Sequence, residues 1–456
     1  MPSLASKVMR CQEARWPALI LGLLVSAAAA EPVSKQGLSF SGSFRSRFET
    51  LDGEFRRNRV GSDQLLTLRT DLRLDLSRER WFAQAELIDA RAYLASDDTP
   101  LNTTLINALE PVNAHVGLRL GDDEAAGGVL RLGWQTLDLG SRRLVARNRW
   151  RNTTNAFLGA SLDWHHATGS QTKAFAVSTM NRLPNDRAGL RDNDIELDDA
   201  SAERRFVGLF HAGEGLGRPL ELWALHLDEG DAPGAPSANR RLWTLGFRVR
   251  QAAGRQAWDW ELESAVQFGR ARATRLPADA TDLDVRAHFE HLSVGYRFDA
   301  ALEPRLALDV DYASGDADPE DDRFGAFDQL FGAAVGDLGP RGLFGAFNRS
   351  NLLLVGGRLD WRLPADVDGS LRIRQASLAE RRDRWRGTLL GDPAGAPRDL
   401  GVQTELQFRW RPAGKHHSVA GGLAWLAKGA FQADPDVGTN EQGDSVYGWF
   451  DLSLAF

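Results

Sequence analysis

Apolar and polar side chains alternate, residue by residue, along much of this 456-residue chain. A period of two residues is the pattern of a β-strand whose two faces meet different surroundings. No stretch approaches the ~18 consecutive apolar residues that a membrane-spanning helix needs. The chain therefore predicts an all-β fold. The clearest alternating segments are residues 64–77, 240–251, 257–270, 304–314, 348–363, 398–411 and 445–456.

The last segment shows how the two faces of such a strand differ. One face carries Val446, Gly448, Phe450, Leu452, Leu454 and Phe456, and the other carries Tyr447, Trp449, Asp451, Ser453 and Ala455. A soluble sandwich would bury the apolar face against a second sheet, and strand by strand that alternative fits equally well. A closed barrel would turn it towards lipid, because closure leaves no unpaired backbone edge in hydrocarbon. A strand of this kind, ending in an aromatic residue, resembles the closing strand of a bacterial outer-membrane β-barrel.

The lengths of the connections favour the barrel. Alternation over the whole chain gives about eighteen candidate strands. Short turns alternate with long polar segments, as periplasmic turns alternate with extracellular loops, and an even strand count puts both termini on the periplasmic side. We therefore expect a single 18-stranded antiparallel transmembrane β-barrel. The long segments are residues 51–63, 93–112, 139–155, 181–202, 228–239, 271–284, 315–347, 380–397 and 429–444.

Tryptophans near the predicted strand ends agree with a membrane barrel, because aromatic girdles lie at the two membrane interfaces. The residues in question are Trp81, Trp134, Trp223, Trp243, Trp258, Trp260, Trp361, Trp410, Trp425 and Trp449. Core tryptophans of a sandwich are the alternative for some of them.

Residues 1–30 are typical of a secretory signal, with basic residues, the apolar run 16–25 and small residues 27–30 before Glu31. The single cysteine, Cys11, lies inside this segment, so we expect no disulfide in the mature chain. The net charge of −7 argues against a nucleic-acid partner. The predicted organisation is a signal peptide over 1–30 and a barrel over 31–456, in the outer membrane of a Gram-negative bacterium.

A barrel of this size encloses a water-filled lumen, so its function should depend on inward side chains. Guanidinium groups are permanently charged and bind carboxylates bidentately, and a ring of them would attract anions. Inward acids such as Asp311 and Glu261 leave the alternative that these arginines form structural cross-strand pairs. Alternation predicts that the inward arginines include Arg45, Arg47, Arg69, Arg73, Arg119, Arg131, Arg248, Arg358, Arg372, Arg374 and Arg409.

The longest predicted loop, residues 315–347, is too aromatic for a merely solvated segment. It carries Phe324, Phe327, Phe331, Phe344 and Phe347. We predict that it folds into the lumen or packs at its mouth as a gate. The acids at 316–322 alternate as in calcium loops but lack the glycine and glutamate of that motif, so a solvated loop is favoured over loose cation binding. No arrangement of a nucleophile, histidine and acid stands out, so we expect no enzyme activity, cofactor or metal.

Two groups of motifs resemble the alginate export family. The first is Arg131-Leu-Gly-Trp-Gln135 followed by Gly140-Ser-Arg-Arg-Leu-Val145, Trp150-Arg151 and Phe157; the second is Asp311-Tyr-Ala-Ser-Gly-Asp316 with Phe327-Asp-Gln-Leu-Phe331. The resemblance implies a monomeric 18-stranded barrel whose arginine-lined constriction passes an anionic uronate polymer. It makes Arg143 and Arg151 candidates for that constriction, and Asp311 and Asp316 candidates for anchoring the long loop.

Two positions depart from the family pattern. Trp134 stands where the family has an arginine, and Leu158 stands where it has an aspartate. The change could be a compensated exchange of an ion pair for an apolar contact, or it could mark a substrate other than alginate. Alternation points Trp134 at lipid, and a bulge would turn it inward.

The leading hypothesis is an outer-membrane channel for an anionic poly- or oligosaccharide. The alternatives are a porin for uptake of small organic anions and a non-transporting structural or adhesive barrel. The expected partners are outer-membrane lipid, the anionic substrate and, for export, periplasmic components of an export complex.

Overall fold

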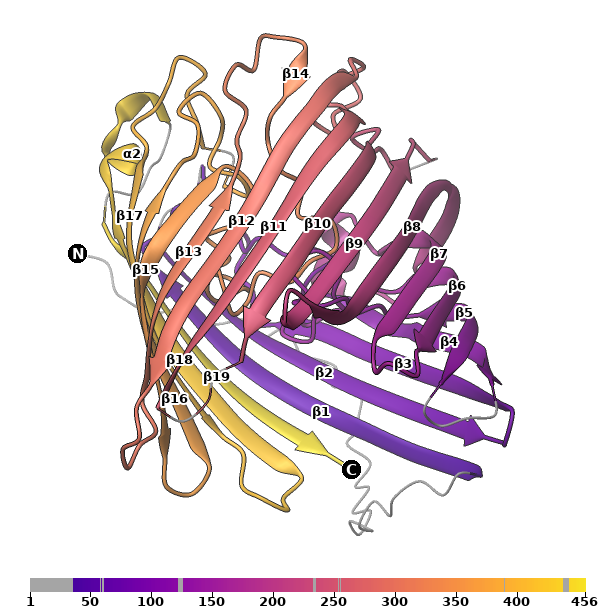
Figure 1. Ribbon diagram of the computed structural model, residues 1–456. Helices are drawn as coiled ribbons and strands as arrows, with labels where there is room; N and C mark the ends of the chain where they lie inside the picture. Colours follow the sequence, from indigo (N-terminus) through magenta and orange to yellow (C-terminus); the bar gives the residue numbers. More distant parts are fainter. Residues whose placement is uncertain are drawn as a thin grey trace, which may run out of the picture.

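The computed structural model describes residues 36–57, 59, 61–121, 126–232, 235–252, 254, 256–388, 390–437 and 443–456 (Figure 1). These residues form one sheet of 19 strands, in which β1 pairs with both β2 and β19, so the sheet is closed. Strand β14 has only two residues, and the other eighteen strands make the barrel wall. The predicted signal peptide and Cys11 lie outside the described residues.

The wall strands and the short elements have the following bounds: β1 Gly37–Asp52, β2 Ser62–Ser77, β3 Trp81–Tyr93, β4 Asn107–Leu120, β5 Gly127–Gln135, β6 Phe157–His165, β7 Gln171–Asn181, α1 Arg187–Asp192, β8 Asp199–Gly215, β9 Arg218–Glu229, β10 Arg241–Gln251, β11 Ala257–Ala271, β12 Leu283–Arg297, β13 Arg305–Ala313, β14 Arg323–Phe324, β15 Leu352–Leu363, β16 Val367–Ser377, β17 Asp399–Trp410, β18 His417–Lys428, α2 Ala430–Ala433, the 3₁₀ turn Pro435–Val437 and β19 Ser445–Ala455. No helix in the described part of the chain is long and apolar enough to cross a membrane.

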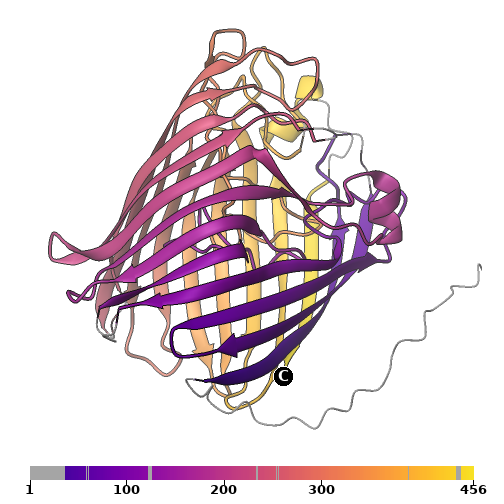
Figure 2. The same ribbon diagram turned by 90° about the vertical axis from the view of Figure 1, so that its right-hand side faces the viewer.

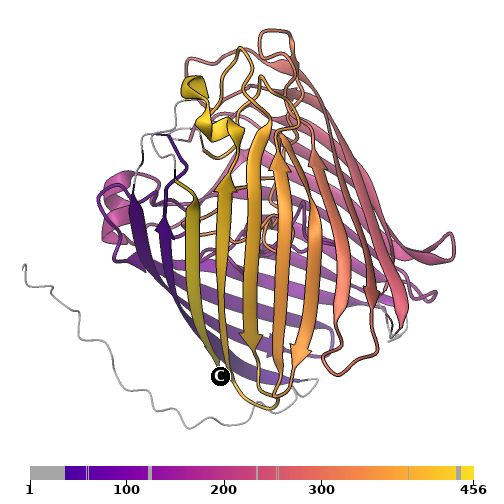
Figure 3. The ribbon, with the colours of Figure 1, turned by 90° about the vertical axis from the view of Figure 1, so that its left-hand side faces the viewer.

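Neighbouring wall strands are antiparallel all the way round, which confirms the predicted 18-stranded barrel. Nine long loops lie at one end of the barrel, and the short turns and the C-terminus lie at the other (Figures 1, 2 and 3). The strand predicted over 348–363 begins only at Leu352. Asn351 still belongs to the loop, where its side chain binds the carbonyls of Glu380 and Arg384.

The two faces of the wall separate as the alternation predicts. Leu74 on the outer face of β2 is 42% exposed, whereas Arg69 on the inner face is 5% exposed. Trp81, Trp243, Trp258, Trp410 and Trp425 are exposed on the outer surface. The girdle prediction is wrong for Trp223 and Trp449, which are buried inside the barrel because their strand positions face inward.

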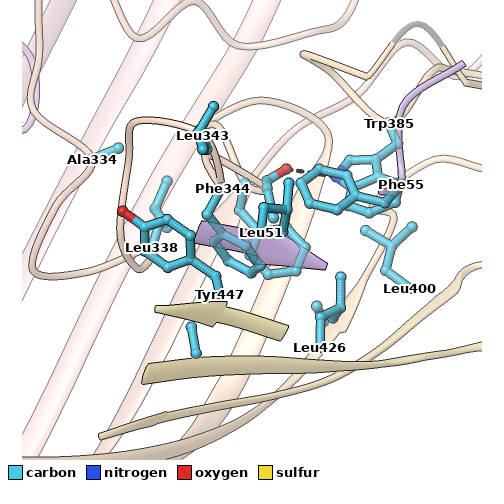
Figure 4. Packing of buried hydrophobic residues seen from close by; sticks show 14 of the residues in the cluster. Leu51, Phe55, Ala334, Leu338, Leu343, Phe344, Trp385, Leu400, Leu426 and Tyr447 are labelled. Atoms are coloured by element: carbon cyan, nitrogen blue, oxygen red, sulfur yellow. Dashed lines mark hydrogen bonds between the residues drawn. The ribbon is translucent and has the colours of Figure 1, made fainter. Parts of the chain in front are cut away.

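Inside the barrel, an apolar cluster ties four extracellular loops together (Figure 4). Phe55 comes from the β1–β2 loop, Phe344 from the β13–β15 loop, Trp385 from the β16–β17 loop and Phe431 from the segment before β19. Phe55 stacks on Trp385 with the ring centroids 5.4 Å apart, and Phe344 stacks on Tyr447 of β19 at the same separation. The loops are therefore fixed to each other and to the wall by apolar burial.

A second apolar cluster lies on the opposite side and contains the first half of the long β13–β15 loop. Phe327 packs on Phe289 of β12, with ring centroids 5.6 Å apart. Phe331 packs on Phe157 and Phe206, at 5.3 Å and 5.1 Å. The loop is anchored at both of its ends, so its middle is held across the barrel.

We predict that Phe344→Ala loosens the long loop without unfolding the barrel. Truncating a buried phenylalanine costs about 3–5 kcal/mol, and here the loss falls on one loop. Tryptic cleavage after Arg341 in the folded protein should accelerate at least tenfold. Phe450→Ala, which removes a 54% exposed ring on the outer face, is the control and should leave the cleavage rate unchanged. Equal rates in the two variants would show that the loop is held by other contacts.

Candidate functional site

The loop between β5 and β6, residues 136–156, folds inward and is held by arginines of the barrel wall. Arg45 donates to the carbonyl oxygens of Arg149 and Trp150, each at 3.0 Å, and to that of Arg151 at 2.9 Å. Arg69 donates to the carbonyl of Arg151 at 3.3 Å. Loop carbonyls that would face an open lumen are thus satisfied by guanidinium groups, which is why the loop stays inside.

Arg47 of β1 reinforces this contact. Its guanidinium lies 3.9 Å from the ring centroid of Trp150, and it donates to the Trp150 carbonyl at 2.8 Å. It also forms a buried ion pair with Asp451 of β19 at 2.5 Å. Trp150 makes an edge contact with Trp449, with centroids 4.6 Å apart. These contacts hold the Arg47 side chain between the loop and the wall.

The long β13–β15 loop, residues 314–351, also enters the lumen and reaches the wall. The Leu343 amide donates to Glu49 of β1 at 2.8 Å, and Tyr447 of β19 donates to the Arg341 carbonyl at 3.2 Å. Arg372 and Arg374 of β16 donate to the carbonyls of Gly336 and Asp337. Its five phenylalanines pack in the apolar clusters or at their margins: Phe327, Phe344 and Phe347 are buried, and Phe324 and Phe331 are partly buried.

The two inward loops are joined to each other. Val145 and Phe331 form a parallel bridge, in which the Phe331 amide donates to the Leu144 carbonyl at 3.0 Å and the Ala146 amide donates to the Phe331 carbonyl at 3.2 Å. The Ala333 amide donates to the Arg142 carbonyl at 2.9 Å. Together the loops form one hydrogen-bonded partition within the lumen.

Arg143 links this partition to the wall. Its guanidinium pairs with Glu261 and Glu263 of β11, each at 2.5 Å, and with Asp337 of the long loop at 2.8 Å. Burial lowers the pKa of Arg143, and the carboxylates of Asp337, Glu263 and Glu261 raise it by more than burial lowers it. The pKa of Arg143 therefore lies well above its usual value. Three carboxylates already neutralise this guanidinium and accept its hydrogen bonds. Arg143 therefore holds the structure together and is not free to bind a substrate.

Other arginines at the partition have no such partner. Arg45, Arg151, Arg182 and Arg341 make no ion pair with any carboxylate in the described part of the chain; their contacts are with backbone carbonyls and amide oxygens. Burial lowers the pKa of Arg151, and the neighbouring Arg182, Arg341 and Arg69 lower it further. Burial, with Arg56 and Arg349 nearby, lowers the pKa of Arg341 to about 10. The partition therefore carries four positive charges that no direct ion pair among the described residues neutralises.

On the turn side of the partition, two cavities of about 630 Å³ and 440 Å³ adjoin along the β1–β7 wall and share Arg73 and Arg149. Cations outnumber acids in their lining. The cations are Arg45, Arg69, Arg73, Arg119, Arg131, Arg147, Arg149 and Lys173, and the acids are Asp71, Asp75, Glu86, Asp138 and Asp163. We call this pair the cation-rich cavities.

A third cavity, of about 320 Å³, lies against the β10–β15 wall and has the opposite balance. It is lined by the acids Asp259, Glu261, Asp309, Asp311 and Asp337, by the arginines Arg143, Arg250, Arg305 and Arg358, and by His291. We call it the acidic cavity. The two sides of the lumen thus present different charge to a solute.

The remaining predicted arginines divide between these surroundings. Arg73 and Arg131 pair with Asp75 and Asp163 beside the cation-rich cavities. Arg119 lines the larger of these cavities, and its hydrogen bonds go to Ser77 and to backbone carbonyls of the turn after β2. Arg248 pairs with Glu221 and Glu261, and Arg358 with Asp309. Arg409 is exposed near the turn end of β17.

Several residues of the site escaped the sequence prediction. Arg147, Arg149, Arg182 and Arg341 all lie in loops, where alternation gives no direction. Lys173 lies on the inner face of β7. The motif Trp150-Arg151 pointed to the right loop. No sequence signal joined it to Arg182 or Arg341, because that proximity arises only when three loops fold together.

The family motifs occupy definite places. Asp316 accepts from the Gly325 amide at 3.2 Å within the long loop, whereas Asp311 pairs with His291 of the wall at 2.9 Å. Trp134 and Leu158 are directly opposite each other in the β5–β6 register. Simple alternation along β5 holds, so both lie on the outer face, as an apolar pair. Among the described residues, no group of three or more metal-ligating side chains is present.

Comparison with known proteins agrees with this architecture. The family model for alginate export matches residues 36–443. No curated protein shows significant sequence similarity to the chain. Among solved structures, the outer membrane protein OpdK of Pseudomonas aeruginosa is 12% identical with a TM-score of 0.55, covering 92% of this chain and 99% of that one.

Two further structures have the same fold. Pseudomonas aeruginosa OccK2 in complex with glucuronate is 16% identical with a TM-score of 0.53, covering 91% of this chain and 98% of that one. Acinetobacter baumannii OccAB4 is 11% identical with a TM-score of 0.56, covering 92% and 99%. The barrel and the family match identify an outer-membrane channel of a Gram-negative bacterium: the chain belongs to the alginate export family.

Proposed function

We propose that the channel passes anionic sugar polymers or oligomers of the uronate type, such as alginate. The observation that carries the proposal is the set of four guanidinium groups without a carboxylate partner at the partition, those of Arg45, Arg151, Arg182 and Arg341. Each uronate unit carries one carboxylate, which must lose part of its hydration to pass a narrow point. A guanidinium replaces that hydration with a charge-assisted hydrogen bond worth about 1.5–3 kcal/mol.

The cation-rich cavities supply the approach to this point. Their excess of positive charge raises the local concentration of anions, while the interspersed acids keep each contact weak enough for release. The acidic cavity, with five acids against four arginines, offers carboxylates no excess of positive charge, so the path follows the β1–β7 wall. The barrel acts by charge and shape as a monomer, without a chemical step. Export would add periplasmic partners.

The main alternative is uptake of small organic anions. It is favoured by the glucuronate complex of OccK2 and by the vanillate complex of OpdK, two barrels of the same fold. A single uronate would use the same guanidinium groups, so the two functions differ in the length of the substrate. A structural or adhesive barrel would not need uncompensated arginines in its lumen.

Anion selectivity should depend on the unpaired arginines. Replacing Arg45, Arg151 and Arg341 together by glutamine, which retains some hydrogen bonding to the loop carbonyls, should reduce the anion-to-cation permeability ratio at least threefold. The measurement is the reversal potential under a salt gradient in planar bilayers. Arg358→Gln, in the acidic cavity and paired with Asp309, is the matched control and should not reduce anion preference. Equal shifts in both proteins would contradict the proposed path.

Current through a single channel should distinguish the substrate class. A defined oligouronate, added to the turn side, should cause voltage-dependent blocking events, because its carboxylates enter the cation-rich cavities and pause at the partition. Neutral dextran of the same length should cause none. If the monomer glucuronate blocks as well as a hexauronate, uptake of small anions is the better description; block by dextran would contradict both.

The long loop should limit the conductance. We propose that residues 315–347, with Phe324, Phe327, Phe331, Phe344 and Phe347 as anchors, form a fixed constriction, and gating would require these contacts to break. Deleting residues 325–339 removes the strand-like contact with the β5–β6 loop and should at least double single-channel conductance. Wild-type conductance in a correctly folded deletion variant would exclude a role for this loop in the constriction.

A further inference from the structure

The outer surface of β8 to β12 carries a continuous row of charged residues near the extracellular ends of the strands. Direct cross-strand neighbours follow in the order Arg205, Asp228, Arg241, Arg270 and Asp284. Arg241 and Arg270 are 58% and 62% exposed. We call these five residues the arginine row. Strands β8 to β12 lie side by side in Figure 1, with their extracellular ends at the top.

The surface next to this row, on the membrane side, is mainly aromatic and apolar, with Arg286 at its β12 edge. The next outward positions are Val207, His226, Trp243, Phe268 and Arg286, in the same cross-strand order. Beyond them lie Leu209, Leu245 and Val266, which are 53%, 39% and 49% exposed. Aromatic side chains of a membrane barrel lie at headgroup level, above the acyl region. The arginine row therefore lies at or just outside the lipid headgroups.

The row carries three arginines against two aspartates, so its net charge is positive. Arg241 and Arg270 are directly opposite each other and face the same way, an arrangement that is repulsive on its own. Each of these two arginines has one exposed ion-pair partner: Arg241 is 3.9 Å from Asp228, and Arg270 is 3.3 Å from Asp284. Exposed pairs of this kind contribute little. An anionic ligand between the two guanidinium groups would relieve the repulsion.

We propose that the arginine row is a binding site for the phosphorylated sugar headgroup of a glycolipid in the outer leaflet. Guanidinium groups bind phosphate bidentately, and basic pockets at headgroup depth are typical lipid sites. Trp243 and Phe268, directly below, would contact the first part of the acyl chains. The two aspartates would face sugar hydroxyls or divalent ions between phosphates. This site lies outside the lumen and does not depend on the transported substrate.

Binding is tested on the mature protein in detergent by native mass spectrometry, with diphosphoryl lipid A as the probe. The wild-type protein should retain bound lipid A, and the variant Arg241→Gln/Arg270→Gln should bind it at least tenfold more weakly. The control Arg362→Gln/Arg411→Gln removes two equally exposed arginines, 64% and 59%, at the turn end and should bind like the wild type.

Two further probes separate the possible results. Dephosphorylated lipid A should bind the wild-type protein weakly, with an affinity similar to that of the double variant for diphosphoryl lipid A. Tight binding of dephosphorylated lipid A to the wild type would overturn the proposal. Phosphatidylglycerol should bind at least tenfold more weakly than diphosphoryl lipid A, and equal binding would mean a general anionic surface and would also overturn it. If the double variant fails to fold, the wild-type protein alone still tests the proposal. Diphosphoryl lipid A should raise the unfolding temperature of the wild type, and dephosphorylated lipid A should not.

Discussion

The structure depends on one constraint, that backbone groups in lipid must find partners within the chain. Pairing β1 with β19 meets it, because the closed sheet has no edge in hydrocarbon. Closure also fixes which face of the wall each strand residue occupies: Leu74 of β2 turns outward and Arg69 turns to the lumen. An interior of this size cannot be filled by wall side chains alone. Two loops fill part of it beside the cavities, and their own backbone groups then need partners inside.

Arginine meets that second need in two different ways. Arg143 is neutralised by Glu261, Glu263 and Asp337 and joins the long loop to the wall. Arg45 and Arg341, in contrast, donate hydrogen bonds to carbonyl oxygens, which do not cancel the positive charge. The same residue type thus supplies the joints of the partition and its positive potential. An arginine-rich lumen attracts anions only where positively charged side chains outnumber acids. In this barrel that region lies along the β1–β7 wall.

The sequence predicted the barrel well because alternation is a local property. Strand β2, the nine long loops and the inward direction of Arg69 all follow from a period of two. It failed where position depends on tertiary folding. Trp449 was placed in a girdle although its parity faces inward. The phenylalanines of the long loop correctly suggested that this loop is not solvated, but only the fold shows that Phe344 and Phe327 are its anchors. Arg182 and Arg341 meet Arg151 across three loops, and no local pattern encodes that meeting.

The family signature can be reconsidered in the same terms. Trp134 and Leu158 replace an arginine and an aspartate, and here they are cross-strand partners on the outer face, where an exposed pair of charges would meet lipid. An apolar pair at these positions removes the cost of burying two charges without leaving either one unpaired. In this chain the two residues are part of the outer surface and contribute nothing to the lining of the lumen. The arginines without a carboxylate partner among the described residues, Arg45 of β1 and Arg151, Arg182 and Arg341 of the loops, are therefore the positions where a change of residue would alter the charge inside the barrel most directly.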